Sequence, residues 1–101
     1  MQILAISKMK EDITPDKMGP HLDDEVKHTL EAYLDGEIRN HWFRTDRPGV
    51  VFMLECEDEQ EARRDLDALP LVVAGLIDFD LISLQPLVPL RRLIGRDISK
   101  L

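Results

Sequence analysis

Apolar residues divide the chain into segments with the spacing of strands and segments with the spacing of helices. Residues 2–7 are almost wholly apolar, which predicts a short strand that is buried on both faces or central in its sheet. Residues 37–45 and 50–54 predict two further strands, and the turn chemistry of residues 46–49 between them indicates an antiparallel hairpin. Residues 76–84 predict a last strand, which is the most hydrophobic of the four.

The second predicted strand alternates less cleanly than the others. Simple alternation places two sets of side chains on opposite faces: Ile38, Asn40, Trp42 and Arg44 on one, and Arg39, His41 and Phe43 on the other. Because neither set is apolar throughout, we expect this strand to lie beside a cavity or at a rim.

Thr14 and Pro15 predict a helix start, with Thr14 as the N-cap and Pro15 at the first helical position. Gly19 and Pro20 interrupt that helix, so the main helix is expected to restart at Pro20. Its apolar residues follow one stripe that is predicted to be buried: Leu22, Val26, Leu30 and Tyr33 or Leu34. Gly36 is the expected left-handed cap at its end.

Asp58 and Glu61 form a capping-box-like pair that predicts the start of a second helix. Pro70 ends this helix, and residues 71–74 are expected to form an apolar connection before a tight bend at Gly75. The inner stripe of the helix consists of Ala62, Leu66 and Leu69.

The predicted order of strand, helix, strand, strand, helix and strand is that of a ferredoxin-like βαββαβ domain with a four-stranded antiparallel sheet. We expect one such domain over residues 1–101, with residues 86–101 as a C-terminal tail packed on the body or on a neighbouring subunit. Two helices cover one face of such a sheet, and the other face is too apolar to remain in water. A homodimer that brings two sheets face to face, a dimeric α+β barrel, would bury that face and enclose a cavity.

The formal charge of −7, from 20 acidic and 13 basic residues, argues against nucleic acid and anionic membranes as partners. Cys56 is the only cysteine, and a packed thiol is the more common role for such a residue. The N-terminus does not resemble a signal peptide, so the expected location is the cytoplasm. The spacing of His21, His28 and His41 does not suggest a metal site.

Several motifs at constant spacing between residues 23 and 86 resemble the muconolactone delta-isomerase family. They are Asp35-Gly36, Arg39, Trp42, Glu55, Glu61-Ala62, Leu69-Pro70-Leu71, and Asp78 and Asp80 ahead of Pro86. The resemblance implies a dimeric α+β barrel that assembles further. It also implies an enzyme that moves a double bond in a butenolide by proton transfer, without a metal or an organic cofactor.

A 1,3-proton shift needs a base that returns the proton and donors that stabilise an enolate. Glu25 is the first candidate for the base, because the resemblance places a glutamate at the matching position; the alternative is a solvated glutamate on a helix surface. His28 and His41 are alternative catalytic residues, although a lone histidine is more often a packing residue.

Candidate substrate-binding residues fall on the second and fourth predicted strands. Arg39 or Arg44 would hold an anionic ligand beside Trp42, or would stack at a subunit interface. Asp78 and Asp80 are about 6–7 Å apart on one strand face, which suits acid and base roles. A salt bridge to Arg91 or Arg92 across a subunit contact is the other interpretation.

The leading hypothesis is a cofactor-independent isomerase that acts on a small anionic lactone or acid held in the barrel cavity. A second hypothesis is a non-catalytic dimeric barrel, either a stress-associated or a small-ligand-binding protein. A third is a cofactor-free oxygenase or a haem-binding relative on the same scaffold.

Overall fold

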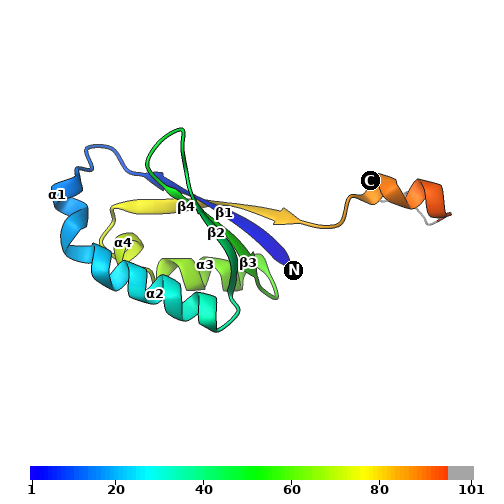
Figure 1. Cartoon of the computed structure of the whole chain (residues 1–101), viewed down its shortest axis with the longest axis horizontal. Helices are drawn as coiled ribbons and strands as arrows, with labels where there is room; N and C mark the ends of the chain where they lie inside the picture. The colour runs from blue at the N-terminus through cyan, green and yellow to red at the C-terminus, as the bar shows by residue number, and fades with distance from the viewer. Residues whose placement is uncertain (96–101) are drawn as a thin grey trace.

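The computed structural model describes residues 1–95 and has the predicted ferredoxin-like α+β fold (Figure 1). Four strands form one antiparallel sheet in the order β2-β3-β1-β4, and the long helices lie on one side of it. The elements are β1 (Gln2–Met9), α1 (Pro15–Met18), the 3₁₀ segment η1 (Gly19–His21), α2 (Leu22–Leu34), β2 (Ile38–Phe43), β3 (Val50–Glu55), α3 (Glu59–Asp67), α4 (Pro70–Val73), β4 (Ile77–Leu84) and the 3₁₀ segment η2 (Val88–Ile94). No helix in this range is both long enough and apolar enough to cross a membrane.

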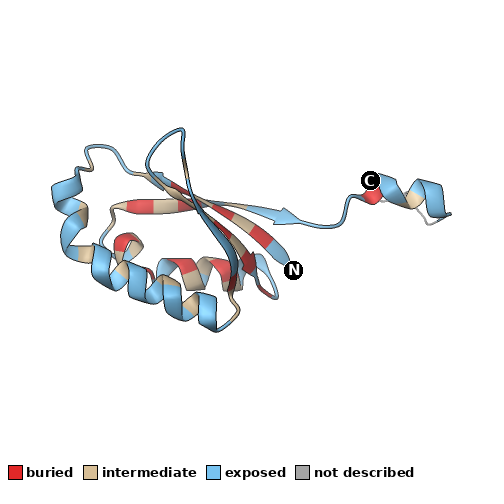
Figure 2. Ribbon diagram, in the orientation of Figure 1, coloured by how far each residue is buried: buried red, intermediate tan, exposed pale blue. Residues whose placement is uncertain are grey.

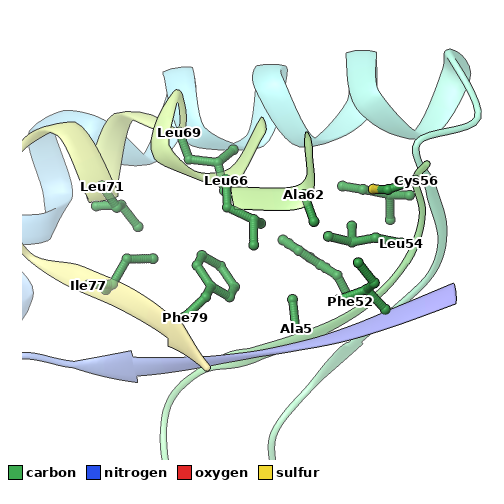
Figure 3. Close-up of a cluster of buried hydrophobic side chains, with 12 residues drawn as sticks. Ala5, Phe52, Leu54, Cys56, Ala62, Leu66, Leu69, Leu71, Ile77 and Phe79 are labelled. Atoms are coloured by element: carbon green, nitrogen blue, oxygen red, sulfur yellow. The ribbon is translucent and has the colours of Figure 1, made fainter. Parts of the chain in front are cut away.

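The core lies between the sheet and α3 (Figure 3). In the register of the sheet, Ala5 stands opposite Phe52 on one side and Leu81 on the other, so alternate residues of these strands share the helix-covered face. The rings of Phe52 and Phe79 stack at a centroid distance of 5.8 Å. Twelve buried residues make up this cluster: Ile3, Ala5, Ile38, Phe52, Leu54, Cys56, Ala62, Leu66, Leu69, Leu71, Ile77 and Phe79.

The predicted start of α3 is confirmed, whereas its predicted inner stripe is confirmed only for Ala62 and Leu66, because Leu69 is buried but lies beyond the end of α3. The Asp58 carboxylate accepts a hydrogen bond of 2.8 Å from the Glu61 N–H, and Glu61 in turn accepts one of 3.1 Å from the Glu57 N–H. These bonds satisfy donors that the first turn of a helix otherwise leaves unpaired. Ala62 and Leu66 are buried against the sheet, as their spacing predicts.

The apolar connection predicted after Pro70 is instead the short helix α4. Pro70 fits the first position of α4 because the N–H that it lacks has no partner there. Leu71 is buried in the core, and the chain then turns at Gly75, whose φ of +75° confirms the predicted bend.

The prediction of a buried stripe on α2 is wrong within one copy of the chain. No residue of this helix is buried, and Leu22, Val26 and Leu30 are 44%, 57% and 56% exposed (Figure 2). The stripe faces the sheet across an open cavity instead of a filled core. The predicted helix restart is close to the observed one, since η1 joins α1 to α2, but the Thr14 side chain makes no capping hydrogen bond.

The simple alternation predicted for β2 is wrong because the strand contains a bulge. Ile38 pairs with Leu54 while Asn40 pairs with Met53, so Arg39 is an extra residue in the ladder. Ile38 therefore faces the helices, together with His41 rather than with Asn40.

The sheet face away from the helices carries alternating apolar residues, as the sequence analysis expected. They are Leu4, Ile6, Val51, Met53, Ile82 and Leu84, all half-buried or exposed. We refer to these six residues as the open face. Within a single copy no helix of residues 1–95 covers the open face (Figure 1).

The described part of the C-terminal tail continues past the end of β4 and forms η2 beyond the edge of the body (Figure 1). A short 3₁₀ segment thus forms within the predicted tail. In this copy it lies apart from α2 and α3 and does not pack on them. The rest of the predicted tail, residues 96–101, lies outside the described residues.

Candidate functional site

A cavity of about 480 Å³ lies between α2 and the sheet, on the helix-covered side. The sequence analysis expected a cavity between two facing sheets, whereas this one is formed by elements of a single copy. Its lining comes from β1, α2, β2, β3 and the loop before β3, with contributions from α4 and β4. Most of the lining is apolar, and its polar residues on the helix-covered side are Ser7, Glu25, Thr29, Tyr33 and His41.

Glu25 projects from α2 into this cavity and is half-buried. Its Oε2 atom is buried and has no hydrogen-bond partner in the described protein. Burial raises the pKa of Glu25 above its ordinary value, although the Leu71 backbone and the charge of His28 act in the opposite direction. An unpaired carboxylate oxygen with a raised pKa, facing an apolar cavity, has the properties of a general base.

His41 reaches the same cavity because the bulge at Arg39 turns it toward the helices. Its ring meets that of Tyr33 edge to face, with the centroids 5.3 Å apart. The two side chains supply hydrogen-bond donors opposite an apolar wall. The sequence analysis assigned Tyr33 only to a helix stripe, and the spacing of the chain offers no signal for its contact with His41.

His28 does not share this cavity. It lines a smaller pocket of about 210 Å³ on another side of α2, with Arg64 and Asp65 of α3. Glu25 and His41 therefore line the same cavity, whereas His28 lines the other pocket, although its charge still acts on Glu25.

Arg39 and Arg44, the candidate anion holders, are not among the described side chains that line the cavity. Arg44 is held by Asp46, with an Nη2–Oδ2 distance of 2.7 Å, and also donates to the Ser7 carbonyl. This pairing lowers the pKa of Asp46 to about 2. Arg39 is exposed and donates to the carbonyl of Gly36 at 2.9 Å. Trp42 is the candidate binding residue that borders the cavity, but its pairing with Val51 places its half-exposed side chain on the face of the sheet away from the helices.

Asp78 and Asp80 lie on the opposite side of the sheet from the cavity, next to the open face. Asp80 forms an ion pair of 2.8 Å with Lys8, and Asp78 lies 3.5 Å from Arg63. Within one copy these carboxylates thus pair with Lys8 and Arg63, and no ion pair joins them to Arg91 or Arg92, the two arginines in the described part of the tail.

Acidic groups surround Cys56 near the smaller pocket. Burial, followed by the charge of Asp65, raises the pKa of the Cys56 thiol to about 11. A thiol with this pKa stays protonated at neutral pH and is a poor nucleophile, in agreement with a packing role. Among residues 1–95, no group of three or more histidine, cysteine, aspartate or glutamate side chains is arranged to hold a metal ion.

Solved structures that are similar to this chain include two enzymes. Muconolactone isomerase superimposes with a TM-score of 0.69 and 19% identity, over 86% of this chain and 93% of that one. The 5-chloro-2-hydroxyhydroquinone dehydrochlorinase TftG from Burkholderia phenoliruptrix AC1100, in complex with 2,5-dihydroxybenzoquinone, gives a TM-score of 0.62 and 18% identity over 84% and 94%.

No protein-family model matches the sequence, and no curated protein matches it. At these identities the likeness establishes the fold. The chain thus has the ferredoxin-like α+β fold that muconolactone isomerase also adopts, as its sequence motifs predicted.

Proposed function

We propose that this protein is a cofactor-independent isomerase that moves a proton on a small ring compound bound between α2 and the sheet. Glu25 is the base. The observation that carries the proposal is a half-buried glutamate, with one carboxylate oxygen buried and unpartnered, in the lining of an apolar cavity of about 480 Å³. A carboxylate in this setting takes up a proton readily, because burial disfavours its charged form.

The proposed reaction is a 1,3-proton shift. The Glu25 carboxylate removes a proton from the γ carbon, beyond the double bond that is conjugated with the carbonyl group. The electron pair of that C–H bond forms the new double bond, and the conjugated system becomes a dienolate. His41 or Tyr33 donates a hydrogen bond to the enolate oxygen, which stabilises the negative charge. Glu25 then returns the proton two carbons away, so the double bond moves and the enzyme is restored.

The proposed substrate is a small oxygenated ring with a conjugated carbonyl group. The two similar enzymes support this class, since one is named for a lactone and the other was solved with a dihydroxybenzoquinone. A negative charge on the ligand would have to be met by His41, because Arg39 and Arg44 are engaged outside the cavity.

The test is to mix the purified protein with muconolactone and related butenolides and follow their ultraviolet absorbance. In parallel, NMR in deuterated water would report exchange of the proton next to the carbonyl. We expect Glu25→Gln to lower the rate by 10²-fold or more, in keeping with the usual contribution of a general base. Glu31→Gln is the matched control, since Glu31 is an exposed glutamate on the same helix.

Turnover and exchange that are absent in the wild type, or that persist in Glu25→Gln, would rule out the proposal. A second candidate is small-ligand binding without catalysis, which the largely apolar lining favours. Under that alternative, butenolides would quench the fluorescence of Trp42, the only tryptophan, and no substrate proton would exchange in either protein.

A further inference from the structure

The last described residues carry apolar side chains that the body of the same copy leaves uncovered. Leu87, Leu90 and Ile94 are more than half exposed, and Leu93 is 90% exposed. Exposed apolar side chains on a short helical segment are typical of a segment that packs against another protein surface. We refer to residues 87–95 as the arm.

A second uncovered apolar surface borders the cavity. It follows the outer edge of α2 and continues onto α4 and the end of β2, and it consists of Leu22, Val26, Leu30, Leu34, Phe43 and Val73. All six are exposed, and four of them line the cavity: Leu22, Val26, Leu30 and Phe43. A segment that packed on this surface would close the cavity and would also bury the apolar stripe of α2.

The arm cannot easily provide that cover in its own copy. β4 begins at Ile77, which lines the cavity, and ends at Leu84, which pairs with Gln2 at the far end of β1. Eight strand residues span about 26 Å, and the arm continues away from the cavity beyond that point (Figure 1). A second copy in a two-fold dimer, by contrast, can present its arm at the other end of the sheet, and each copy then receives the arm of the other.

The charges of the two surfaces are complementary. The arm carries Arg91 and Arg92, whereas the exposed residues of α2 include three carboxylates, Asp23, Asp24 and Glu31, and one lysine, Lys27. Opposite charges beside two apolar stripes fix the orientation in which the stripes meet, and they disfavour other partners.

We propose that the arm of one copy lies across α2 of a second copy and closes the cavity. Leu90 and Leu93 contact the stripe of α2, and Arg91 and Arg92 face its carboxylates. The cavity is then completed by the partner copy. This proposal concerns the same cavity as the proposed function but does not depend on proton transfer there.

The experiment is intermolecular paramagnetic relaxation in a mixture of two forms of the full chain. One form carries a nitroxide on Ile94→Cys, an exposed position beside the two contact residues, without isotope label. The other form is uniformly ¹⁵N-labelled with its native arm. We expect selective loss of the amide signals of α2, above all those of Leu22, Val26 and Leu30. Wild-type protein taken through the same labelling reaction is the control for Cys56, whose buried thiol has a pKa of about 11.

Charge reversal tests the orientation. Arg91→Glu with Arg92→Glu, in both forms, is expected to weaken the loss of signal, and adding Asp23→Lys with Asp24→Lys is expected to restore it. All four residues are at least partly exposed, so these variants leave the core intact. Unchanged α2 signals in the first mixture overturn the proposal, whether the protein is then a monomer or a dimer. The loss of signal depends on the distance between the nitroxide and the α2 amides and not on catalysis. The experiment would therefore give the same result if the isomerase proposal failed.

Discussion

At the scale of single residues, Glu25 is the side chain whose environment departs most from that of its neighbours on α2. The acidic residues around it are exposed, whereas one of its carboxylate oxygens is buried without a partner. The sequence offered two interpretations, a base and a solvated glutamate. Helix periodicity could not decide between them, because it does not report whether the space beneath a helix is filled.

The raised pKa of Glu25 predicts how stability depends on pH. Below the ordinary glutamate pKa, the side chain is protonated in the folded and unfolded states alike and carries no charge penalty. As pH rises through the raised pKa of the folded state, ionisation of the buried carboxyl destabilises the wild type. The free energy of unfolding of Glu25→Gln, relative to wild type, should therefore increase between about pH 4 and neutrality.

Urea unfolding at a series of pH values and one protein concentration measures this difference. Glu31→Gln, at an exposed position on the same helix, is the control variant for the substitution itself. A constant difference between Glu25→Gln and wild type over this range would mean that the Glu25 carboxyl is solvated.

At the scale of elements, the agreement between sequence and structure depends on how local the controlling interactions are. The start of α3 was predictable because Asp58 and Glu61 act within one turn. The bulge at Arg39 was not, because it exists only in the pairing of β2 with β3. The prediction of a buried stripe on α2 was wrong for another reason. A periodic apolar stripe shows that one face of the helix is apolar, and in this chain that face borders an open cavity and is only partly shielded from water.

Replacement of the α3 cap should have a measurable cost. Asp58→Ala removes the acceptor for the Glu61 N–H and is expected to lower the free energy of unfolding by about 1 kcal/mol. Asp58→Asn keeps an acceptor at the same place and should recover most of the loss. Asp67→Ala, at the other end of α3, should cost little, since an acidic residue there opposes the helix dipole. Chemical denaturation monitored by circular dichroism distinguishes the three variants, and equal losses for all three would contradict the capping argument.

At the scale of the whole molecule, the open face is the feature that a single copy leaves incomplete. Its six apolar residues lie side by side on three adjacent strands, and monomeric proteins rarely expose a continuous apolar surface of this kind. The order of the strands was predictable from the pattern of elements, because few topologies satisfy it. What covers the open face was not predictable from that pattern, because a covering partner is a separate molecule.

We predict that a second copy covers the open face. Met53→Asp puts a charge at its centre, where Met53 pairs with Leu4, and is expected to convert a dimer to a monomer. Light scattering coupled to gel filtration measures the mass, and circular dichroism checks that the fold persists. Arg64→Glu, on the exposed side of α3, should remain dimeric. A wild type that elutes as a monomer would refute the prediction.

The alternation along β1 has a consequence for how this protein can change. Ser7 lines the cavity and Ile6 belongs to the open face, although they are adjacent in the chain. In the proposed dimer, cavity residues and sheet-contact residues therefore alternate along β1, so a point substitution in this strand alters either the cavity or the sheet contact and leaves the other unchanged. Insertion or loss of one residue in β1 would instead exchange the two sets and abolish both properties at once.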